Sequence, residues 1–208
     1  MDPTIPHKLV LLYVIFVCYL AGCKKESTTI VEPIPSPEIV PLEVGNKWIR
    51  SFELYDTSGN VFSSGVDSII VVRDTSILRL RWFILKLQAS EYLVSNQPGG
   101  LWWRSGQYQS IWYQYPAERG DSFFVYGNTS FVRVSAVDTL ITVAAGSFSC
   151  YRYEYDIPPS VGAIGGSRVV EFLSPNTGYV KYEYYQSTFT SQTQFLYSRI
   201  QLTSLHLN

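Results

Sequence analysis

Short apolar runs, alternating or rich in β-branched and aromatic residues, follow one another from residue 47 to residue 202. Turn residues such as Gly, Pro, Asn and Asp separate them, and no long segment repeats its apolar residues with the 3.6-residue period of a helix. Short connections favour antiparallel pairing. We therefore predict an all-β chain with an antiparallel, strongly curved or barrel-like sheet, or a two-sheet sandwich. The predicted strands are Asp67–Arg73, Leu78–Leu87, Gln109–Tyr115, Ser122–Tyr126, Phe131–Val134, Thr139–Val143, Phe148–Tyr155, Arg168–Leu173, Tyr179–Tyr185 and Gln194–Leu202.

Two stretches of the chain echo each other. Pro41–Trp48 reads PLEVGNKW and Pro116–Phe123 reads PAERGDSF, and each is followed by a similar run, VDSII at 66–70 and VDTLI at 137–141. Gly-Asn and Gly-Asp before an aromatic residue fit a tight turn that enters a sheet. The echo indicates either an internally duplicated meander, with halves 41–115 and 116–208, or the chance recurrence of common turn residues.

The N-terminus has the pattern of an export signal. Leu9–Tyr19 is an unbroken apolar run that is too short to span a bilayer but has the length of a signal-peptide core. The next four residues, Leu20–Cys23, read LAGC and resemble the lipobox of bacterial lipoproteins. We expect residues 1–22 to be a cleaved signal peptide and Cys23 to carry the lipid. The alternative is a signal anchor in which the cysteine is incidental.

A Pro-rich stretch follows the cysteine. Residues 23–40 contain Pro33, Pro35 and Pro37, which favour an extended tether over regular pairing. Lys24 and Lys25, rather than Asp, follow the cysteine, as in lipoproteins sorted to an outer membrane. We expect a lipidated tether over 23–40, a β-rich domain over 41–208, and a location in the cell envelope, on the outer membrane, facing either the periplasm or the surface.

Composition argues against several chemistries. The formal net charge is −1 and the charges are interspersed, so nucleic acid is not an expected partner. His206 would be the single histidine after cleavage, which disfavours Ser-His-Asp triads and His-rich zinc sites. Cys150 would have no second thiol to pair with, and it is either a core residue or a reactive thiol. We expect no catalysis, cofactor or metal.

Paired carboxylates offer the one route to an enzyme. Glu154 and Asp156 lie two apart and share a strand face, as a glycosidase pair would require. Arg152 shares the same face, which favours a solvated row of charges instead.

Tryptophans supply the candidate ligand-binding residues, Trp102, Trp103 and Trp112. Adjacent Trp102 and Trp103 must point to opposite faces of a strand, so one of them is outward unless both faces are covered. An exposed tryptophan can stack on a sugar ring or mark a protein contact. The alternative is that both are buried between sheet and loop.

One hairpin can be predicted in register. Arg168–Leu173 and Tyr179–Tyr185 flank the turn Ser174–Gly178, in which Gly178 can adopt a positive φ. The simplest register places Leu173 opposite Tyr179, Glu171 opposite Lys181 and Val169 opposite Glu183. Glu171 and Lys181 would then form an ion pair on the wetter face. The face toward the core would carry Val170, Phe172, Val180, Tyr182 and Tyr184.

Three segments carry a resemblance to a family. Pro41–Trp48, Ala145–Tyr153 and Ser174–Glu183 resemble recurring stretches of uncharacterised lipoproteins of Gram-negative bacteria, with the patterns P-L-x-x-G-N-x-W, A-G-x-F-x-C-Y and P-x-x-G-x-V-K-Y-E. Asn176-Thr177-Gly178 stands where the commoner turn has Gly-Val-Gly. The resemblance implies a sheet-rich lipoprotein.

These observations favour a non-enzymatic envelope lipoprotein that serves as a binding or structural module. Its expected partners are the membrane, through the lipid, and an envelope protein or glycan. Two alternatives stay open, a glycan-binding module that uses exposed Trp and Tyr, and a carrier of a hydrophobic ligand in a curved sheet. An empty apolar concavity would favour the carrier, a flat aromatic platform the glycan binder, and a packed sandwich the plain scaffold.

Overall fold

A computed structural model describes residues 38–125, 131–159, 165–187 and 193–208. The expected signal peptide over residues 1–22, Cys23 and most of the expected tether lie outside these residues. The described residues form twelve strands: β1 (Lys47–Tyr55), β2 (Val61–Ile77), β3 (Leu80–Leu87), β4 (Ser90–Gln97), β5 (Gly100–Ser105), β6 (Tyr108–Gln114), β7 (Ser122–Phe124), β8 (Phe131–Val143), β9 (Gly146–Ile157), β10 (Ser167–Ser174), β11 (Gly178–Ser187) and β12 (Gln194–His206).

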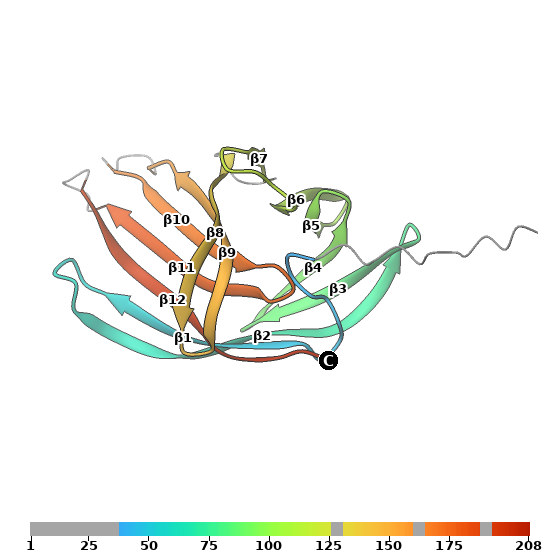
Figure 1. Cartoon of the computed structure of the whole chain (residues 1–208), viewed down its shortest axis with the longest axis horizontal. Coiled ribbons are helices and arrows are strands. Elements are labelled where there is room, and N and C mark those ends of the chain that lie inside the picture. Colours follow the sequence, from blue (N-terminus) through green and yellow to red (C-terminus); the bar gives the residue numbers. More distant parts are fainter. Residues whose placement is uncertain (1–37, 126–130, 160–164, 188–192) are drawn as a thin grey trace, which may run out of the picture. The chain divides into compact units, whose positions relative to one another are not determined.

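All twelve strands belong to one antiparallel sheet, in the order β6-β5-β4-β3-β2-β1-β12-β11-β10-β9-β8-β7. Two six-stranded meanders, β1–β6 and β7–β12, are joined where β1 pairs with β12. The sheet curves so strongly that the edge strands β6 and β7 approach each other (Figure 1). Side chains bridge this seam, since Ser110 bonds the Phe124 carbonyl at 3.3 Å and Gln114 bonds Asp121 at 3.2 Å. The predicted all-β, antiparallel and barrel-like fold is confirmed.

The similar sequences Pro41–Trp48 and Pro116–Phe123 also have similar turns. Gly45 and Gly120 have nearly the same φ, 98° and 101°, and each is the third residue of the turn that precedes the first strand of its meander. Three backbone hydrogen bonds recur: Gly45 to Val71 and Gly120 to Val134, Val71 to Asn46 and Val134 to Asp121, Asn46 to Glu43 and Asp121 to Glu118. The similar runs at 66–70 and 137–141 do not occupy equivalent positions in the two meanders. Val71 and Val134 make the equivalent hydrogen bonds, but Val71 follows residues 66–70 whereas Val134 precedes residues 137–141.

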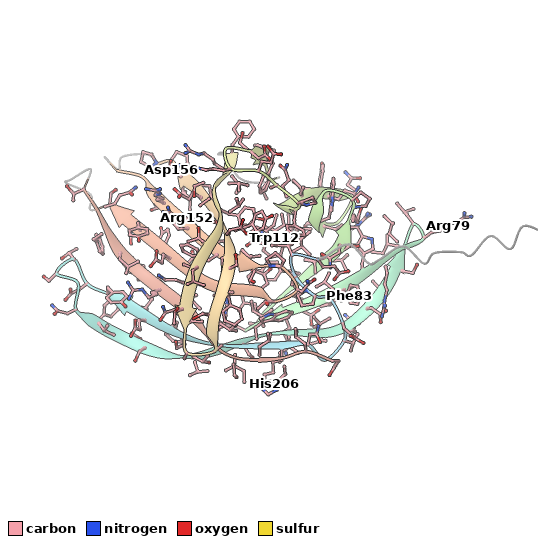
Figure 2. The ribbon with its side chains drawn as sticks, in the orientation of Figure 1. Arg79, Phe83, Trp112, Arg152, Asp156 and His206 are labelled. Carbon is pink, nitrogen blue, oxygen red and sulfur yellow. The ribbon has the colours of Figure 1, made fainter. Side chains whose placement is uncertain are left out.

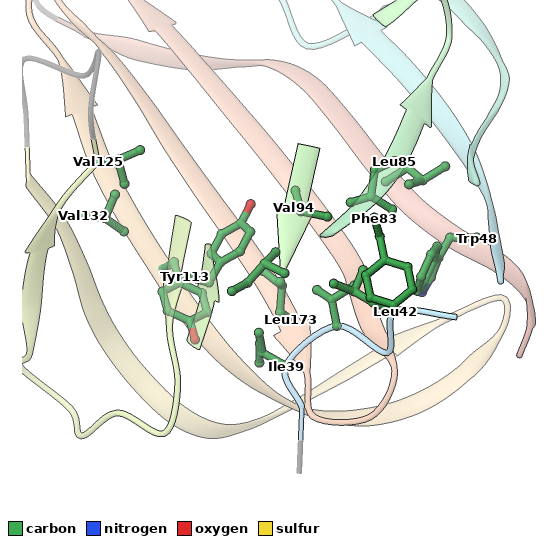
Figure 3. Close-up of a cluster of buried hydrophobic side chains, with 14 of the residues drawn as sticks. Ile39, Leu42, Trp48, Phe83, Leu85, Val94, Tyr113, Val125, Val132 and Leu173 are labelled. Carbon is green, nitrogen blue, oxygen red and sulfur yellow. The ribbon is translucent and has the colours of Figure 1, made fainter. Parts of the chain in front are cut away.

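The segment before β1 closes one end of the sheet. Ile39, Val40 and Leu42 are buried in the main core beside Trp48 and Leu173 (Figure 3). Hydrogen bonds hold this segment, from the Asn96 side chain to the Val40 carbonyl at 2.9 Å and from the Asn176 amide to the Glu38 carbonyl at 2.7 Å. The part of the expected tether that the structure describes, residues 38–40, thus packs against the sheet.

The hairpin of β10 and β11 corrects the predicted register. Leu173 pairs with Tyr179 as expected, but Phe172 pairs with Lys181 and Glu171 with Tyr182. Val180 is therefore an extra residue, a β-bulge, and every later pair is shifted by one. Glu171 and Lys181 lie on opposite faces, so the predicted ion pair was wrong, and Lys181 pairs with Glu183 of its own strand at 2.8 Å.

The two faces of this hairpin are both largely covered. Val170, Phe172 and Val180 form a small core with Cys150, on which Ile141 and Phe148 of the β8–β9 hairpin pack. Tyr182 and Tyr184 share the opposite, interior face with Glu171. The five residues predicted to share one core face therefore lie on two faces: Val170, Phe172 and Val180 in the small core, and Tyr182 and Tyr184 in the interior of the sheet.

Within the described residues, no helical segment has the length and apolar character needed to cross a bilayer.

Candidate ligand cavity

The interior of the sheet encloses a cavity of about 460 Å³ with a mostly apolar wall. This volume lies in the range of small-molecule sites in proteins. Its wall is made by the following residues: Arg50, Leu54, Ile69, Leu85, Leu87, Tyr92, Trp112, Tyr113, Glu171, Tyr179, Val180, Lys181, Tyr182, Tyr184, Tyr197, Ser198 and Ile200.

Strand alternation explains where the interior is solid and where it is hollow. Along β1, Trp48 packs in the core at the end closed by residues 39–42, and Arg50 and Leu54 line the cavity farther along the same face. Along β12, Leu202 belongs to the core, and Ile200 and Ser198 line the cavity. The filled core is thus the floor of the cavity.

Three wall residues sit at β-bulges. Trp112 is the extra residue between the pairs Leu101–Tyr113 and Trp102–Ile111, and Val180 and Tyr197 occupy the same kind of position in β11 and β12. A bulge changes where a side chain points and bends its strand. Because of the bulge, the neighbours Trp112 and Tyr113 both line the cavity, with ring centroids 5.7 Å apart.

The second meander contributes four tyrosines and one carboxyl to the wall, together with Val180, Lys181, Ser198 and Ile200. Glu171 lies on the interior face of β10, directly between Tyr153 of β9 and Tyr182 of β11. Removal from water raises the pKa of the Glu171 carboxyl to about 7. The interaction with the Tyr113 hydroxyl and the positive charge of Arg50 lower this pKa, but by less than the loss of hydration raises it. The carboxyl is therefore close to half-protonated at neutral pH.

Both cations among the wall residues, Arg50 and Lys181, have acidic partners. Arg50 donates from Nε and an Nη to both oxygens of Asp67, at 2.8 Å each, and both side chains are almost fully buried. This bidentate geometry satisfies the Asp67 carboxylate and neutralises the guanidinium charge locally.

The structure separates the three candidate tryptophans. Trp112 lies inside the sheet (Figure 2), with its ring centroid 5.5 Å from that of Tyr92. Trp103 pairs with Val94 and Trp102 with Ser95, so the two point to opposite faces, and both are half-buried. The Trp102 indole donates to the Pro98 carbonyl at 3.3 Å. Trp112 is the member of the trio that lines the cavity.

Solved structures of two bacterial proteins are similar to this chain. A protein of Bacteroides fragilis, described as exported and as having a YmcC-like fold, matches with a TM-score of 0.54 and 13% identity, over 83% of this chain and 100% of its own. A protein of Parabacteroides distasonis, described as a lipoprotein, matches with a TM-score of 0.45 and 18% identity, over 82% of this chain and 99% of its own. No protein-family profile and no curated protein sequence matches the chain. At such identities the first similarity shows the fold alone.

The remaining candidates lie outside the cavity wall. Burial raises the pKa of the Cys150 thiol to about 12, so its nucleophilic thiolate is nearly absent at neutral pH. Glu154 forms ion pairs with Arg152 and Arg168 on the opposite face of the sheet, and Asp156 is exposed. Desolvation acts to raise the pKa of Glu154, but the Ser135 hydroxyl and the two arginines outweigh it and lower that pKa. The Glu154 side chain is therefore mostly buried between two arginines, and Asp156 lies on the same face of the sheet.

Sequence reasoning did not identify Glu171, Tyr113 or Arg50 as site residues. The signal for Glu171 was present, since it is an acidic residue inside the otherwise apolar run Val169–Leu173. Without the bulge at Val180, however, the simplest register assigned it to the wetter face with Lys181 as its partner.

Proposed function

We propose that this protein is a non-enzymatic, lipid-anchored protein of the cell envelope that holds an apolar or amphipathic ligand inside its curved sheet. The observation that carries the proposal is the cavity, because an empty, mostly apolar concavity is what distinguishes a carrier from a packed scaffold. The tryptophans do not form a flat aromatic platform, so the glycan-binding alternative has no comparable support.

The anchor rests on the sequence. The lipobox pattern at Leu20–Cys23 supports lipidation of Cys23, and Lys24 and Lys25 support sorting to the outer membrane. The Bacteroides fragilis protein with the same fold is described as exported, which agrees with a place in the envelope. Several acyl chains on one residue make a stable anchor.

The absence of catalysis is part of the same proposal. Among the described residues, no three potential metal ligands of the His, Cys, Asp or Glu type come together. Glu154 is held by two arginines, and His206 is exposed near the end of β12. Neither Glu154 nor His206 lines the cavity.

Native mass spectrometry can test the carrier role. The mature chain from residue 23, with Cys23→Ser so that detergent is unnecessary, is mixed with a lipid extract of bacterial envelopes. We expect a bound lipid of defined mass. Ile200→Trp should remove it by filling the cavity, while Leu140→Trp, at a position that is 71% exposed, should keep it.

Two results would contradict the carrier role. The first is an unmodified chain that takes up no lipid under conditions in which it is folded. The second is equal uptake by both tryptophan variants, which would place the ligand outside the cavity. If Ile200→Trp does not fold, Leu87→Trp at another position of the wall replaces it.

A further inference from the structure

Glu171 is the single acidic side chain among the residues that line the cavity. It projects from the middle of β10 toward the interior, opposite the small core formed by Val170 and Phe172. An ionised carboxyl in such a place is costly unless a cation or several hydrogen-bond donors satisfy it.

The described residues offer this carboxyl no salt-bridge partner. Arg50 is engaged by both oxygens of Asp67, and Lys181 pairs with Glu183 at 2.8 Å. Among the described residues, none forms a salt bridge with Glu171. The carboxyl therefore faces the cavity without a salt-bridge partner, and only the contact with Tyr113 and the more distant charge of Arg50 stabilise its ionised form.

Tyr113 is a second polar group of the cavity wall, and its hydroxyl interacts with the Glu171 carboxyl. Its side chain lines the cavity and is 1% exposed, and its hydroxyl makes no hydrogen bond of standard geometry. The ring lies against Tyr153 and Tyr179, with centroid distances of 5.2 Å and 6.1 Å. Buried hydroxyls are normally hydrogen-bonded, and the contact of this hydroxyl with Glu171 falls short of standard geometry, which leaves room for a ligand atom beside the cavity.

We propose that the cavity binds an amphipathic amine, whose protonated amino group contacts Glu171 and the Tyr113 hydroxyl while its hydrocarbon part fills the apolar wall. The proposal rests on the carrier function above. An ammonium group carries only donors, a carboxylate only acceptors, and a tyrosine hydroxyl can accept as well as donate. The faces of the surrounding tyrosine rings are favourable to a cation.

The groups around Glu171 predict how binding changes with pH. They are Arg50 of β1 with its partner Asp67 of β2, Tyr113 of β6, Tyr153 and Tyr155 of β9, and Tyr179 and Tyr182 of β11. Burial raises the pKa of each of these tyrosines, so they stay neutral below about pH 9. Glu171, with its pKa near 7, is the group that titrates. Affinity for an amine should therefore rise as the pH increases from about 6 to about 8.

Matched ligands test this proposal by calorimetric titration. Decylammonium, decanol and decanoate share one chain and differ in their head groups, and each is titrated into the mature Cys23→Ser chain. All contacts described for the sheet and cavity lie within residues 38–208, so this change leaves them intact. At about pH 8 we expect decylammonium to bind about tenfold more tightly than decanol, the scale of a hydrogen bond to a charged group.

Variants identify the residues responsible. Glu171→Gln should remove both the preference for the amine and its pH dependence, while decanol still binds. Tyr113→Phe should weaken the amine a few-fold with little effect on decanol. Should Glu171→Gln fail to fold, the proposal is still tested by the amine affinity of Tyr113→Phe and by the pH dependence of amine affinity in the unmodified chain.

The outcomes separate this proposal from the carrier function. Equal binding of amine and alcohol, or tightest binding of decanoate, would overturn the amine proposal and leave the carrier function standing. Unchanged amine preference in Glu171→Gln would overturn it as well. Failure of all three ligands to bind would overturn both.

Discussion

Glu171 holds its proton more tightly in the folded chain than in the unfolded chain, because its ionised form loses hydration inside the sheet. Burial raises the pKa of its carboxyl from 4.5 to about 7. An acid with a raised folded-state pKa makes the free energy of unfolding fall as the pH rises between the two values. Below about pH 4.5 both states are protonated and there is no penalty, and above about pH 7 the penalty is constant.

Glu171→Gln should therefore flatten the stability profile. The gain over the unmodified chain should grow from pH 4.5 to pH 7 and reach at most about 3 kcal/mol, less to the extent that water in the cavity solvates the carboxylate. Urea unfolding at several pH values measures it. Glu43→Gln, at an exposed position, is the control. Parallel profiles for both variants would show that Glu171 is not the titrating group.

Adjacent glycines in the β4–β5 turn allow a second test at the scale of residues. Gly99 and Gly100 both have positive φ, 92° and 135°. A Cβ at Gly99 would meet nothing within 4 Å, whereas one at Gly100 would lie 2.0 Å from the Tyr113 carbonyl oxygen. Backbone close approach, in addition to φ, therefore requires glycine at position 100.

Gly99→Ala should cost about 1 kcal/mol, the ordinary penalty of a left-handed backbone for a residue with a Cβ. Gly100→Ala should cost at least ~3 kcal/mol or prevent folding, because β6 cannot remain paired beside the new methyl group. Thermal unfolding of both variants provides the comparison. Similar melting temperatures would mean that the turn relaxes and that the close approach is unimportant.

At the scale of elements, β-bulges decide which side chains enter the cavity. Single extra residues at Trp112, Val180 and Tyr197 interrupt the alternation of three strands. The bulge at Val180 also moves Lys181 to the face opposite Glu171. Lys181 there contacts the Phe172 ring at 5.5 Å and Glu183 at 2.8 Å.

Double-mutant cycles on this hairpin should report the bulge. Coupling between Glu171 and Lys181 should be close to zero, and coupling between Lys181 and Glu183 should be about 0.2–1 kcal/mol, as for partly exposed pairs. The free energies come from urea unfolding. The opposite ranking would support the simple register without a bulge.

Phe172→Ala tests the small core on the same hairpin. Phe172 is 6% exposed among Val170, Val180 and Cys150, so its loss should cost about 3–5 kcal/mol. Leu140→Ala, at an exposed position of β8, should change stability by less than about 0.5 kcal/mol. Comparable losses at both positions would show that the small core is not packed as described.

Strand boundaries show the limits of pattern reading. Leu78 and Arg79 both have positive φ, 52° and 67°, and turn the chain from β2 into β3. The predicted strand Leu78–Leu87 crossed this turn, because neither residue is a usual signal for two successive left-handed residues. Phe131–Val134 and Thr139–Val143 were predicted as two strands and form one, β8, in which bulges interrupt the pattern. β1, β4 and β5 were not among the ten predicted runs.

At the scale of the whole molecule, the two meanders share one long junction at β1 and β12 and a seam of side-chain bonds at β6 and β7. The cavity lies between them, with wall residues from both. Neither half alone encloses the cavity, so a ligand bound there would stabilise the closed sheet as a unit.

The anchor is a property of the whole molecule that can be tested directly. Cys23→Ser should abolish palmitate labelling and release the protein from the membrane fraction, because the proposed lipid attaches to that thiol. Cys150→Ala should keep both properties, since Cys150 is buried inside the small core. Labelling and fractionation of expressing cells check this. Normal labelling of Cys23→Ser would refute the lipidation proposal.

The sequence by itself determined the fold class, because alternation and turn residues are local properties that survive without knowledge of the partners. It also located the hairpin turn at Ser174–Gly178, where Gly178 has the expected positive φ of 87°. The repeated turns at Gly45 and Gly120 were visible for the same reason.

Only the tertiary structure decided the candidate site. Glu171, Tyr113 and Arg50 meet across strands that are far apart in the sequence, and their meeting depends on the order of strands and on the bulges. A bulge changes the facing of every residue beyond it, yet its own residue has no distinctive pattern. Whether a curved sheet is filled or hollow depends on the summed volume of the inward side chains, which no single segment reveals.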